Sequence, residues 1–234
     1  MILADNLNLV KKISLTVWCA LMLAILPGCS TSKEPEINAI TGLSMGTSYT
    51  VKWVSQDNND YDNVANGVAV ELSRVESSMS TYMDASDLSG FNGAAINKWH
   101  KVPAEMASLV AQSLDLSKQT NGAFDITVGP LVNLWGFGPD PLPKNIPSQD
   151  ALDKLRSVVG YQFLKVQQHP PAMLKLAESA IDLSAIAKGY GVDAVARWLE
   201  LHQLNNYLVE VGGELRAHGK KPDGSLWRIA IETP

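Results

Sequence analysis

Five apolar residues recur at helical spacing in this 234-residue chain and set the first limit on its fold. Each follows the one before by three or four positions, so all lie on one helix face: Val64, Val68, Leu72, Val75 and Met79. A helix with one apolar face is stable when that face packs against another element. Residues 47–54, just before it, have the β-branched and aromatic content of a half-buried strand. We therefore assign the stripe to a core and not to function.

Further elements follow without strict alternation of strand and helix. A helix is predicted over residues 104–119, closed by Asn121 and Gly122. Prolines at 139, 141, 143 and 147 predict a loop, and Ser148 is expected to cap a helix to residue 158, closed by Gly160. The remaining predictions are strands over 163–166, 173–176, 180–183, 207–211 and 227–231, and a helix from 184 to about 202. This order favours an α+β fold, a mixed sheet layered with helices, over a doubly wound one.

Composition excludes several classes of function. With 46% apolar and 18% charged residues the chain is globular, and its net charge of -5 gives no basic surface for a nucleic-acid backbone. Nucleic acid is therefore not expected as a partner. Two cysteines and four histidines without metal-ligand spacing make a disulfide framework or a zinc cluster improbable.

The amino terminus has the pattern of an export signal. Lys11 and Lys12 precede an apolar run over residues 13–26, which covers roughly 20 Å as a helix and is too short to span a bilayer. The run ends in Leu-Pro-Gly-Cys, which resembles a bacterial lipobox with Cys29 as the acylated residue. We predict a signal peptide over 1–28, a polar tether over 29–38 and one domain over 39–234. We therefore expect a periplasmic protein of a Gram-negative bacterium, anchored by lipid to the outer rather than the inner membrane. The alternative for the apolar run is a buried N-terminal helix.

Two motifs imitate known enzyme sites. Residues 42–46 spell G-x-S-x-G, but a nucleophile elbow needs a helix after the serine and here a strand is predicted, which disfavours a serine hydrolase. Residues 189–194 spell G-x-G-x-x-A, with Glu210 about twenty positions on. Because residues 184–188 separate the predicted strand from Gly189, both glycines should lie inside a helix and permit close packing. A nicotinamide enzyme is disfavoured for that reason.

The segment from Asp182 to Tyr190 is the strongest candidate for chemistry. It places an acid at a predicted strand end, Ser184 as a cap and Lys188 in the first helical turn. A helix start presents free N–H groups and the positive end of the dipole, so together with Lys188 it can hold a phosphate or pyrophosphate. An ordinary acid-capped helix without function remains the alternative from these residues alone.

Together with the segment from Asp182 to Tyr190, four further segments resemble the ApbE family of FAD:protein FMN transferases. They are Met45-Gly46-Thr47; Ser80-Thr81-Tyr82; residues 122–131 (GAFDITVGPL) with 135–138 (WGFG); and residues 211–214 (VGGE) with 227–231 (WRIAI). In order and spacing, the Gly-Ala-Phe-Asp segment and the segment from Asp182 to Tyr190 are highly specific. The resemblance covers nearly all of residues 39–234. It implies an ApbE-like, T-fold-like α+β domain.

The resemblance also implies a reaction. Such an enzyme takes FAD and Mg²⁺, transfers FMN to a threonine hydroxyl of an acceptor protein, such as a subunit of an ion-translocating redox complex, and releases AMP. The backbone carbonyl of Ala185 would be a metal ligand. The implied FAD contacts are Met45, Tyr82, Ala123, Phe124, Asp125, Asp182 and Lys188. Aromatic rings and a thioether suit a flavin or adenine, and a hard cation suits a pyrophosphate.

The resemblance has one departure, at the end of the chain. Family members continue into a segment with a His before an Ile-Asp-Pro-x-Thr-Gly-like motif, and then an Asp and a Thr or Ser at the metal. The catalytic His is therefore expected beyond Pro234, the chain reads as C-terminally truncated, and weak FAD binding without turnover is expected of it. Two alternatives stay open: an FAD pyrophosphatase that yields FMN and AMP, and a non-catalytic flavin-binding lipoprotein.

Overall fold

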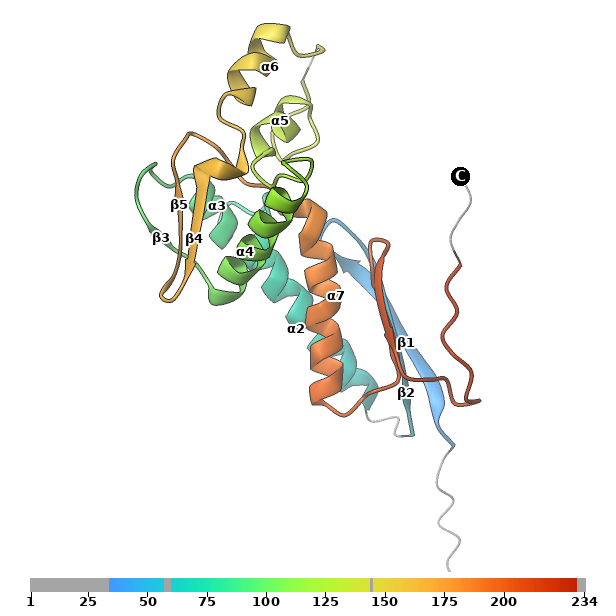
Figure 1. Ribbon diagram of the computed structural model, residues 1–234. Coiled ribbons are helices and arrows are strands. Elements are labelled where there is room, and N and C mark those ends of the chain that lie inside the picture. The colour runs from blue at the N-terminus through green and yellow to red at the C-terminus, as the bar shows by residue number, and fades with distance from the viewer. Residues whose placement is uncertain (1–33, 57–59, 144, 231–234) are drawn as a thin grey trace, which may run out of the picture. The chain divides into compact units, whose positions relative to one another are not determined.

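The computed structural model describes residues 34–56, 60–143 and 145–230, and from Pro35 onward these belong to one compact unit. Figure 1 shows the order of its elements. The strands are β1 (Glu36–Ser44), β2 (Thr47–Ser55), β3 (His100–Lys101), β4 (Leu164–Gln168), β5 (Pro171–Lys175), β6 (Tyr207–Val211) and β7 (Glu214–His218). The helices are α2 (Asp60–Met79), α3 (Asp87–Asn92), α4 (Ala104–Gln119), α5 (Gly129–Leu134), α6 (Gln149–Arg156) and α7 (Ser184–Leu201), with a 3-10 turn η1 (Tyr161–Phe163).

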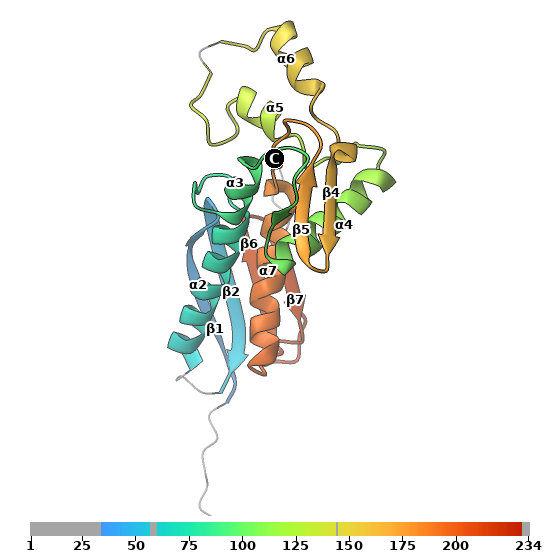
Figure 2. The same ribbon diagram turned by 90° about the vertical axis from the view of Figure 1, so that its left-hand side faces the viewer.

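The larger of the two sheets is antiparallel and has four strands in the order β1-β2-β6-β7. Helices α2 and α7 pack on each other and lie side by side along one face of it (Figures 1 and 2). The apolar stripe of α2 is buried as predicted, from Val64 to Met79. Its first three residues, up to Leu72, meet Trp53 of β2 and Val195 of α7 in one core, whereas Val75 and Met79 belong to a second core with residues of α4 and β5. The sequence pattern therefore identified the buried face of α2, which spans both cores.

A second, three-stranded antiparallel sheet in the order β3-β5-β4 packs against α4. Met106 and Val110 of α4 are fully buried against Met173 of β5. Two antiparallel sheets layered with helices confirm the α+β prediction. Pairing in parallel is confined, among the described residues, to a single bridge between Val128 and Ala180.

Most predicted elements form close to their expected bounds. Helix α4 has the predicted ends, and Asn121 and Gly122 follow it with φ of 50° and 81°, in the left-handed region. The Ser148 side chain caps α6 by accepting a hydrogen bond from Ala151 N, and the proline-rich stretch before it is irregular wherever it is described. Strand β6 matches its prediction residue for residue.

Two predicted strands are wrong. Residues 180–183 make only the bridge at Ala180, because the Asn92 side chain takes up the backbone N–H and carbonyl of Ile181, and Asp182 N donates to the Ile126 carbonyl. Residues 227–230 are irregular although their composition suits a strand, and Trp227 instead donates its indole N–H to the His218 carbonyl at 3.0 Å. Ile231, the last residue of that predicted strand, lies outside the described residues. A strand pattern forms a strand only where a partner edge is available.

The predicted signal peptide over 1–28 and the acylated Cys29 lie outside the described residues. The predicted tether over 29–38 overlaps the structure at its end, because β1 begins at Glu36 and pairs there with Ser55. Among the residues that the structure describes, no helix combines the length and the apolarity needed to cross a bilayer.

Candidate functional site

Two tight hairpin turns meet at one end of the four-stranded sheet. Met45 and Gly46 join β1 to β2 with φ of 54° and 71°, and Gly212 and Gly213 join β6 to β7 with φ of 56° and 96°. Positive φ at both central residues is the type I′ geometry that suits two-residue hairpins. The turns are neighbours, since Gly212 N donates to the Ser48 carbonyl at 3.0 Å. The left-handed backbone conformation is energetically costly for a residue with a side chain, such as Met45. Strained residues of this kind are found most often at functional sites.

The first of these turns also explains the G-x-S-x-G sequence. Ser44 ends β1, and β2 follows after only two residues, so the motif is a hairpin and not a nucleophile elbow. The prediction that a strand follows the serine is confirmed.

Helix α7 begins beside these turns. Asp182 Oδ1 accepts a hydrogen bond from Ser184 N at 2.7 Å, so the acid and not Ser184 binds an N-terminal amide; Leu183 is the N-cap residue and Ser184 is the first helical residue. The predicted Ser184 cap is therefore wrong. Lys188 is the fifth residue of α7 and lies just past the first turn in which it was expected. Asp182, which precedes the N-cap residue, binds this amide because its side chain reaches two residues forward.

The glycines of the G-x-G-x-x-A motif lie inside α7, in a unit whose sheets are antiparallel, so they do not form a dinucleotide fingerprint. Gly191 permits close packing as predicted, because an added Cβ would lie 3.0 Å from the Met45 sulfur. Gly189 does not, since a Cβ there would meet no atom within 4 Å. The packing prediction holds for one glycine and is wrong for the other.

Lys188 is bound by the β6–β7 turn. Its Nζ donates to the Gly212 carbonyl at 3.3 Å and lies 3.2 Å from Glu214 Oε2. A Cβ on Gly212 would come within 2.8 Å of Thr47 Cγ2 and 3.1 Å of Lys188 Cδ. Glycine is thus required there both by φ and by the close approach of the lysine stem.

A cavity of about 560 Å³ opens beside Lys188, within the size range of small-molecule sites. We call it the Met45 cavity. Its wall is apolar at Val75 and Met79 and polar at Lys188. The full lining is Met45, Gly46, Val75, Glu76, Met79, Ser80, Thr81, Tyr82, Ser184, Ala187 and Lys188.

Three of the predicted FAD contacts therefore share one cavity: Met45, Tyr82 and Lys188. They come from a hairpin turn, the segment after α2 and the start of α7. Tyr82 is 65% exposed, and its hydroxyl donates to the Phe137 carbonyl at 2.9 Å, which ties the Ser-Thr-Tyr segment to the Trp-Gly-Phe-Gly segment. Sequence spacing alone could not show this meeting, because the three residues are far apart along the chain.

Asp182 lines a smaller neighbouring cavity of about 190 Å³, which shares Thr81 with the Met45 cavity. Asn92, Gly129 and Ile181 also line it. Asn92 does not stand out in the sequence as a site residue, since an asparagine at a helix end is common. Thr81 belongs to the Ser-Thr-Tyr segment of the resemblance but is not among the predicted FAD contacts.

The segment of Ala123, Phe124 and Asp125 lies beside Asp182 without lining either cavity. The two segments are joined by a hydrogen bond from Asp182 N to the Ile126 carbonyl at 2.8 Å. Ala123 is exposed, and Phe124 is half-buried against the core. Their contacts with FAD stay a prediction.

Asp125 is occupied by its own loop. Its carboxylate accepts from Thr127 N at 2.8 Å, from Thr127 Oγ1 at 2.7 Å and from Tyr161 N at 2.7 Å. It fixes the turn after α4 to the η1 turn. An FAD contact from Asp125 would have to use the remaining lone pairs of this carboxylate, and it also stays a prediction.

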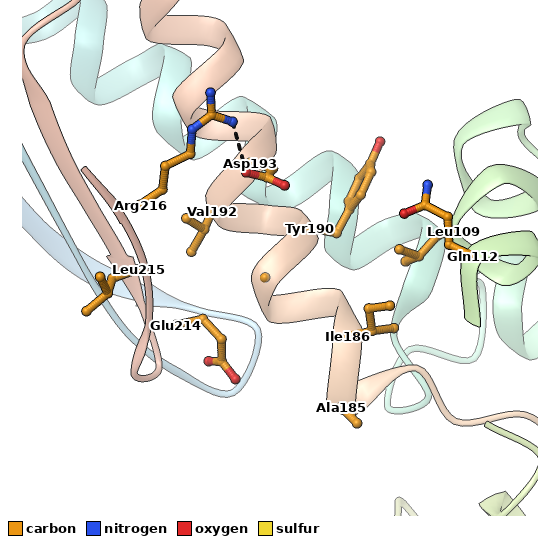
Figure 3. Close-up of a pocket in the computed structure, with 11 residues that line it drawn as sticks. Leu109, Gln112, Ala185, Ile186, Tyr190, Val192, Asp193, Glu214, Leu215 and Arg216 are labelled. Carbon is orange, nitrogen blue, oxygen red and sulfur yellow. Dashed lines mark hydrogen bonds and ion pairs between the residues drawn. The ribbon is translucent and has the colours of Figure 1, made fainter. Parts of the chain in front are cut away.

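A third cavity of about 430 Å³, the Glu214 cavity, lies on another side of α7, between β7 and α4. Figure 3 shows Glu214 and Arg216 on one side of α7, and Tyr190 and Gln112 on the other. Arg216 pairs with Asp193 at 2.9 Å and with Glu200 at 2.7 Å; the hydrogen bond to Asp193 is the main reason that the pKa of Arg216 is raised. Ala185, whose carbonyl is the predicted metal ligand, lines this cavity.

A metal ion would need more ligands than the described residues bring together. Mg²⁺ prefers six oxygens, whereas Ala185 offers one carbonyl, and the described part of the chain has no group of three or more His, Cys, Asp or Glu residues placed to hold a metal. These residues alone do not form a metal site. One ring nitrogen of His202 faces the Trp198 carbonyl, and one of His218 faces the Asn205 carbonyl.

Relatives that are similar to this chain in sequence bear the name FAD:protein FMN transferase. The chain is 39% identical over 213 residues to a FAD:protein FMN transferase of Vibrio cholerae, covering 91% of this chain and 63% of the relative. It is 38% identical over 230 residues to the protein of the same name from Haemophilus influenzae, covering 96% and 66%. The chain thus spans less than two thirds of the length of either relative.

Solved structures show the same fold. The flavin transferase ApbE from Vibrio cholerae superposes with a TM-score of 0.81 at 39% identity, over 86% of this chain and 65% of that one. The apo form of the Pseudomonas stutzeri flavinyl transferase ApbE gives 0.79 at 38% identity, over 85% and 66%. The ApbE family model matches residues 45–234, which include both hairpin turns, the Met45 cavity and the whole of α7. This chain belongs to the ApbE family.

Proposed function

We propose that this protein transfers FMN from FAD to a threonine hydroxyl of an acceptor protein, in a Mg²⁺-dependent reaction that releases AMP. The observation that carries the proposal is the meeting of Lys188, Met45 and Tyr82 around one cavity at the start of α7. Membership of the ApbE family, and the name FAD:protein FMN transferase borne by its relatives, support it.

The residues of the cavity suit a flavin diphosphate. The ammonium of Lys188 and the helix start attract the phosphate groups. Met45 and Tyr82 offer polarizable and aromatic surface to a ring system, and Phe124 does so from the neighbouring segment. Asp182 and Asp125 offer acceptors to amino, ring N–H or ribose groups.

The transfer exchanges a phosphoanhydride bond for a phosphoester bond and involves no oxidation or reduction, so it needs no redox partner. The threonine Oγ attacks the phosphorus on the riboflavin side of the diphosphate and forms a phosphoester bond. The bond from that phosphorus to the bridging oxygen breaks, AMP leaves, and the threonine proton passes to a base. We assign no residue of this chain as that base. Lys188 stabilises the negative charge that grows on the departing phosphate.

Mg²⁺ would neutralise charge on the diphosphate when bound. Of the residues in this chain, we assign only the Ala185 carbonyl as a ligand of that metal ion. The body of the protein would lie in the periplasm, anchored by lipid on Cys29 to the outer rather than the inner membrane. Its acceptors would be threonine-bearing proteins such as subunits of ion-translocating redox complexes.

Mass spectrometry tests the reaction. The full-length protein is incubated with FAD, MgCl₂ and a peptide that carries one threonine, next to the same peptide with valine at that position. The Vibrio cholerae relative serves as a positive control. A mass gain of FMN less one water on the threonine peptide alone supports transfer. AMP and free FMN with an unmodified peptide would mean an FAD pyrophosphatase, and bound but unchanged FAD would mean a flavin carrier; either result overturns the proposal.

A further inference from the structure

The segment from Ser179 to Asp182, which leads into α7, is held in place by side chains. Asn92, the last residue of α3, uses both ends of its amide on one residue. Its Oδ1 accepts from Ile181 N at 2.8 Å and its Nδ2 donates to the Ile181 carbonyl at 2.9 Å. One side chain thus replaces the hydrogen bonds that a neighbouring strand would supply. This explains why the strand predicted over 180–183 is absent.

A buried lysine holds Asn92 in turn. Lys175, at the end of β5, is 3% exposed, and its Nζ donates to the Asn92 carbonyl at 2.6 Å. The same Nζ reaches the Ser179 carbonyl at 3.4 Å. A charged group is costly to bury, and burial lowers the pKa of Lys175. Its position in the core is therefore justified by the two carbonyls that it binds.

The remaining backbone groups of the segment are also bound. Ala180 makes the parallel bridge to Val128, and Asp182 N donates to the Ile126 carbonyl. Directly afterwards, the Asp182 carboxylate takes the Ser184 amide at the start of α7. A continuous series of contacts therefore runs from Lys175 through Asn92 and Ile181 to Asp182.

We propose that Asn92, supported by the buried Lys175, is a positioning residue for the flavin nucleotide site. It fixes Ile181 and, through it, the Asp182 side chain and the first turn of α7. It contacts no reacting atom in this role. The inference rests on the proposed function only where FAD affinity is measured. The effect of Asn92 on the backbone around Ile181 can be measured without FAD.

Hydrogen exchange on the ligand-free protein is the first test. In Asn92→Ala we expect amides 181–186 to exchange about tenfold faster or more, since two hydrogen bonds to the Ile181 backbone are lost. Amides of the buried face of α2 should keep their wild-type protection. Asn66→Ala on the exposed face of α2 is the matched control. Unchanged exchange over 181–186 would overturn the inference, as would an equal acceleration across α2, because that would show a general loss of stability.

FAD affinity is the second test, measured on the full-length protein by calorimetry at a temperature where every variant is folded. We expect a dissociation constant raised about tenfold in Asn92→Ala and unchanged in Asn66→Ala. Asn92→Asp, which keeps the acceptor for Ile181 N, should restore part of the protection at Ile181, and it replaces Asn92→Ala if that variant does not fold. Wild-type affinity in Asn92→Ala would overturn the positioning role. If the wild type itself binds no FAD, the proposed function fails, while hydrogen exchange still decides the inference.

Discussion

Lys188 Nζ lies 3.2 Å from Glu214 Oε2, so the ammonium at the start of α7 shares an ion pair with the β6–β7 hairpin. Their side chains are 32% and 40% exposed. A pair this accessible to solvent adds at most about 1 kcal/mol to stability. Its charges therefore matter more to an anion that enters the Met45 cavity than to the fold.

Opposite effects are expected from the two members of this pair. Lys188→Met removes the cation that faces the diphosphate, and we expect the dissociation constant for FAD to rise tenfold or more. Glu214→Gln removes the carboxylate that competes for that cation, and affinity should increase severalfold at low ionic strength. Calorimetry with Lys52→Met, an exposed lysine on β2, provides the control. Weaker binding in both variants would show that the intact pair, and not a free cation, is what FAD requires.

The two glycines of the helical motif should respond differently to alanine. Gly189→Ala adds a methyl group that meets nothing within 4 Å and removes a flexible residue from the interior of α7, so the free energy of unfolding should rise by about 0.5–1 kcal/mol. Gly191→Ala brings Cβ to 3.0 Å from the Met45 sulfur and should gain nothing or lose stability. Urea unfolding of both variants measures this; an equal gain in both would contradict the packing of Met45 on α7.

Local patterns in the sequence were enough for much of the fold. The α2 stripe, the bounds of α4, the Ser148 cap and β6 follow from periodicity and capping, which depend on near neighbours along the chain. Strand β1 was not predicted, because its isolated pattern is weak and its place depends on pairing with β2. The strand predicted over 180–183 failed for a related reason, since Asn92, about ninety residues earlier, supplies its hydrogen bonds.

The candidate site was predictable only in part. Asp182 and Lys188 lie near each other in sequence and could be recognised at a helix start. The convergence of Lys188 with Met45 and Tyr82 depends on two hairpin turns and on the packing of α7 against α2, which spacing does not encode. Glu214 and Asn92 act on the site through contacts across the fold, so their roles appear only in three dimensions.

Gly212 should be the least tolerant position of the β6–β7 turn. Gly212→Ala introduces a Cβ at φ 56°, within 2.8 Å of Thr47 Cγ2, whereas Gly213→Ala meets no atom within 4 Å although its φ is also positive. Both variants carry backbone strain, and only the first adds a clash. We expect Gly212→Ala to cost about 1–3 kcal/mol more in urea unfolding, and to weaken FAD binding because Lys188 must move. Equal losses would show that backbone strain alone explains the glycine pair.

Tyr207 should give the folded protein an alkaline limit. Its side chain is fully buried and its hydroxyl donates to Glu200 Oε1 at 2.5 Å; burial, followed by this hydrogen bond, raises the pKa of Tyr207 to about 12. Above pH 10 the unfolded chain releases a proton that the folded chain keeps, so the free energy of unfolding should fall as pH rises from 10 to 12. Between pH 9 and 11 the loss due to this group is roughly 1 kcal/mol.

Tyr207→Phe removes the ionisable hydroxyl and should abolish that part of the alkaline loss, although it lowers stability at neutral pH by removing the hydrogen bond to Glu200. Urea unfolding at pH 9 and 11 measures the difference for the wild type, for Tyr207→Phe and for the exposed-residue control Tyr61→Phe. The slope with pH is the diagnostic quantity, because lysine titration contributes equally to all three proteins and cancels. If Tyr207→Phe loses as much stability as the wild type over this interval, the buried hydroxyl is not the group that titrates on unfolding.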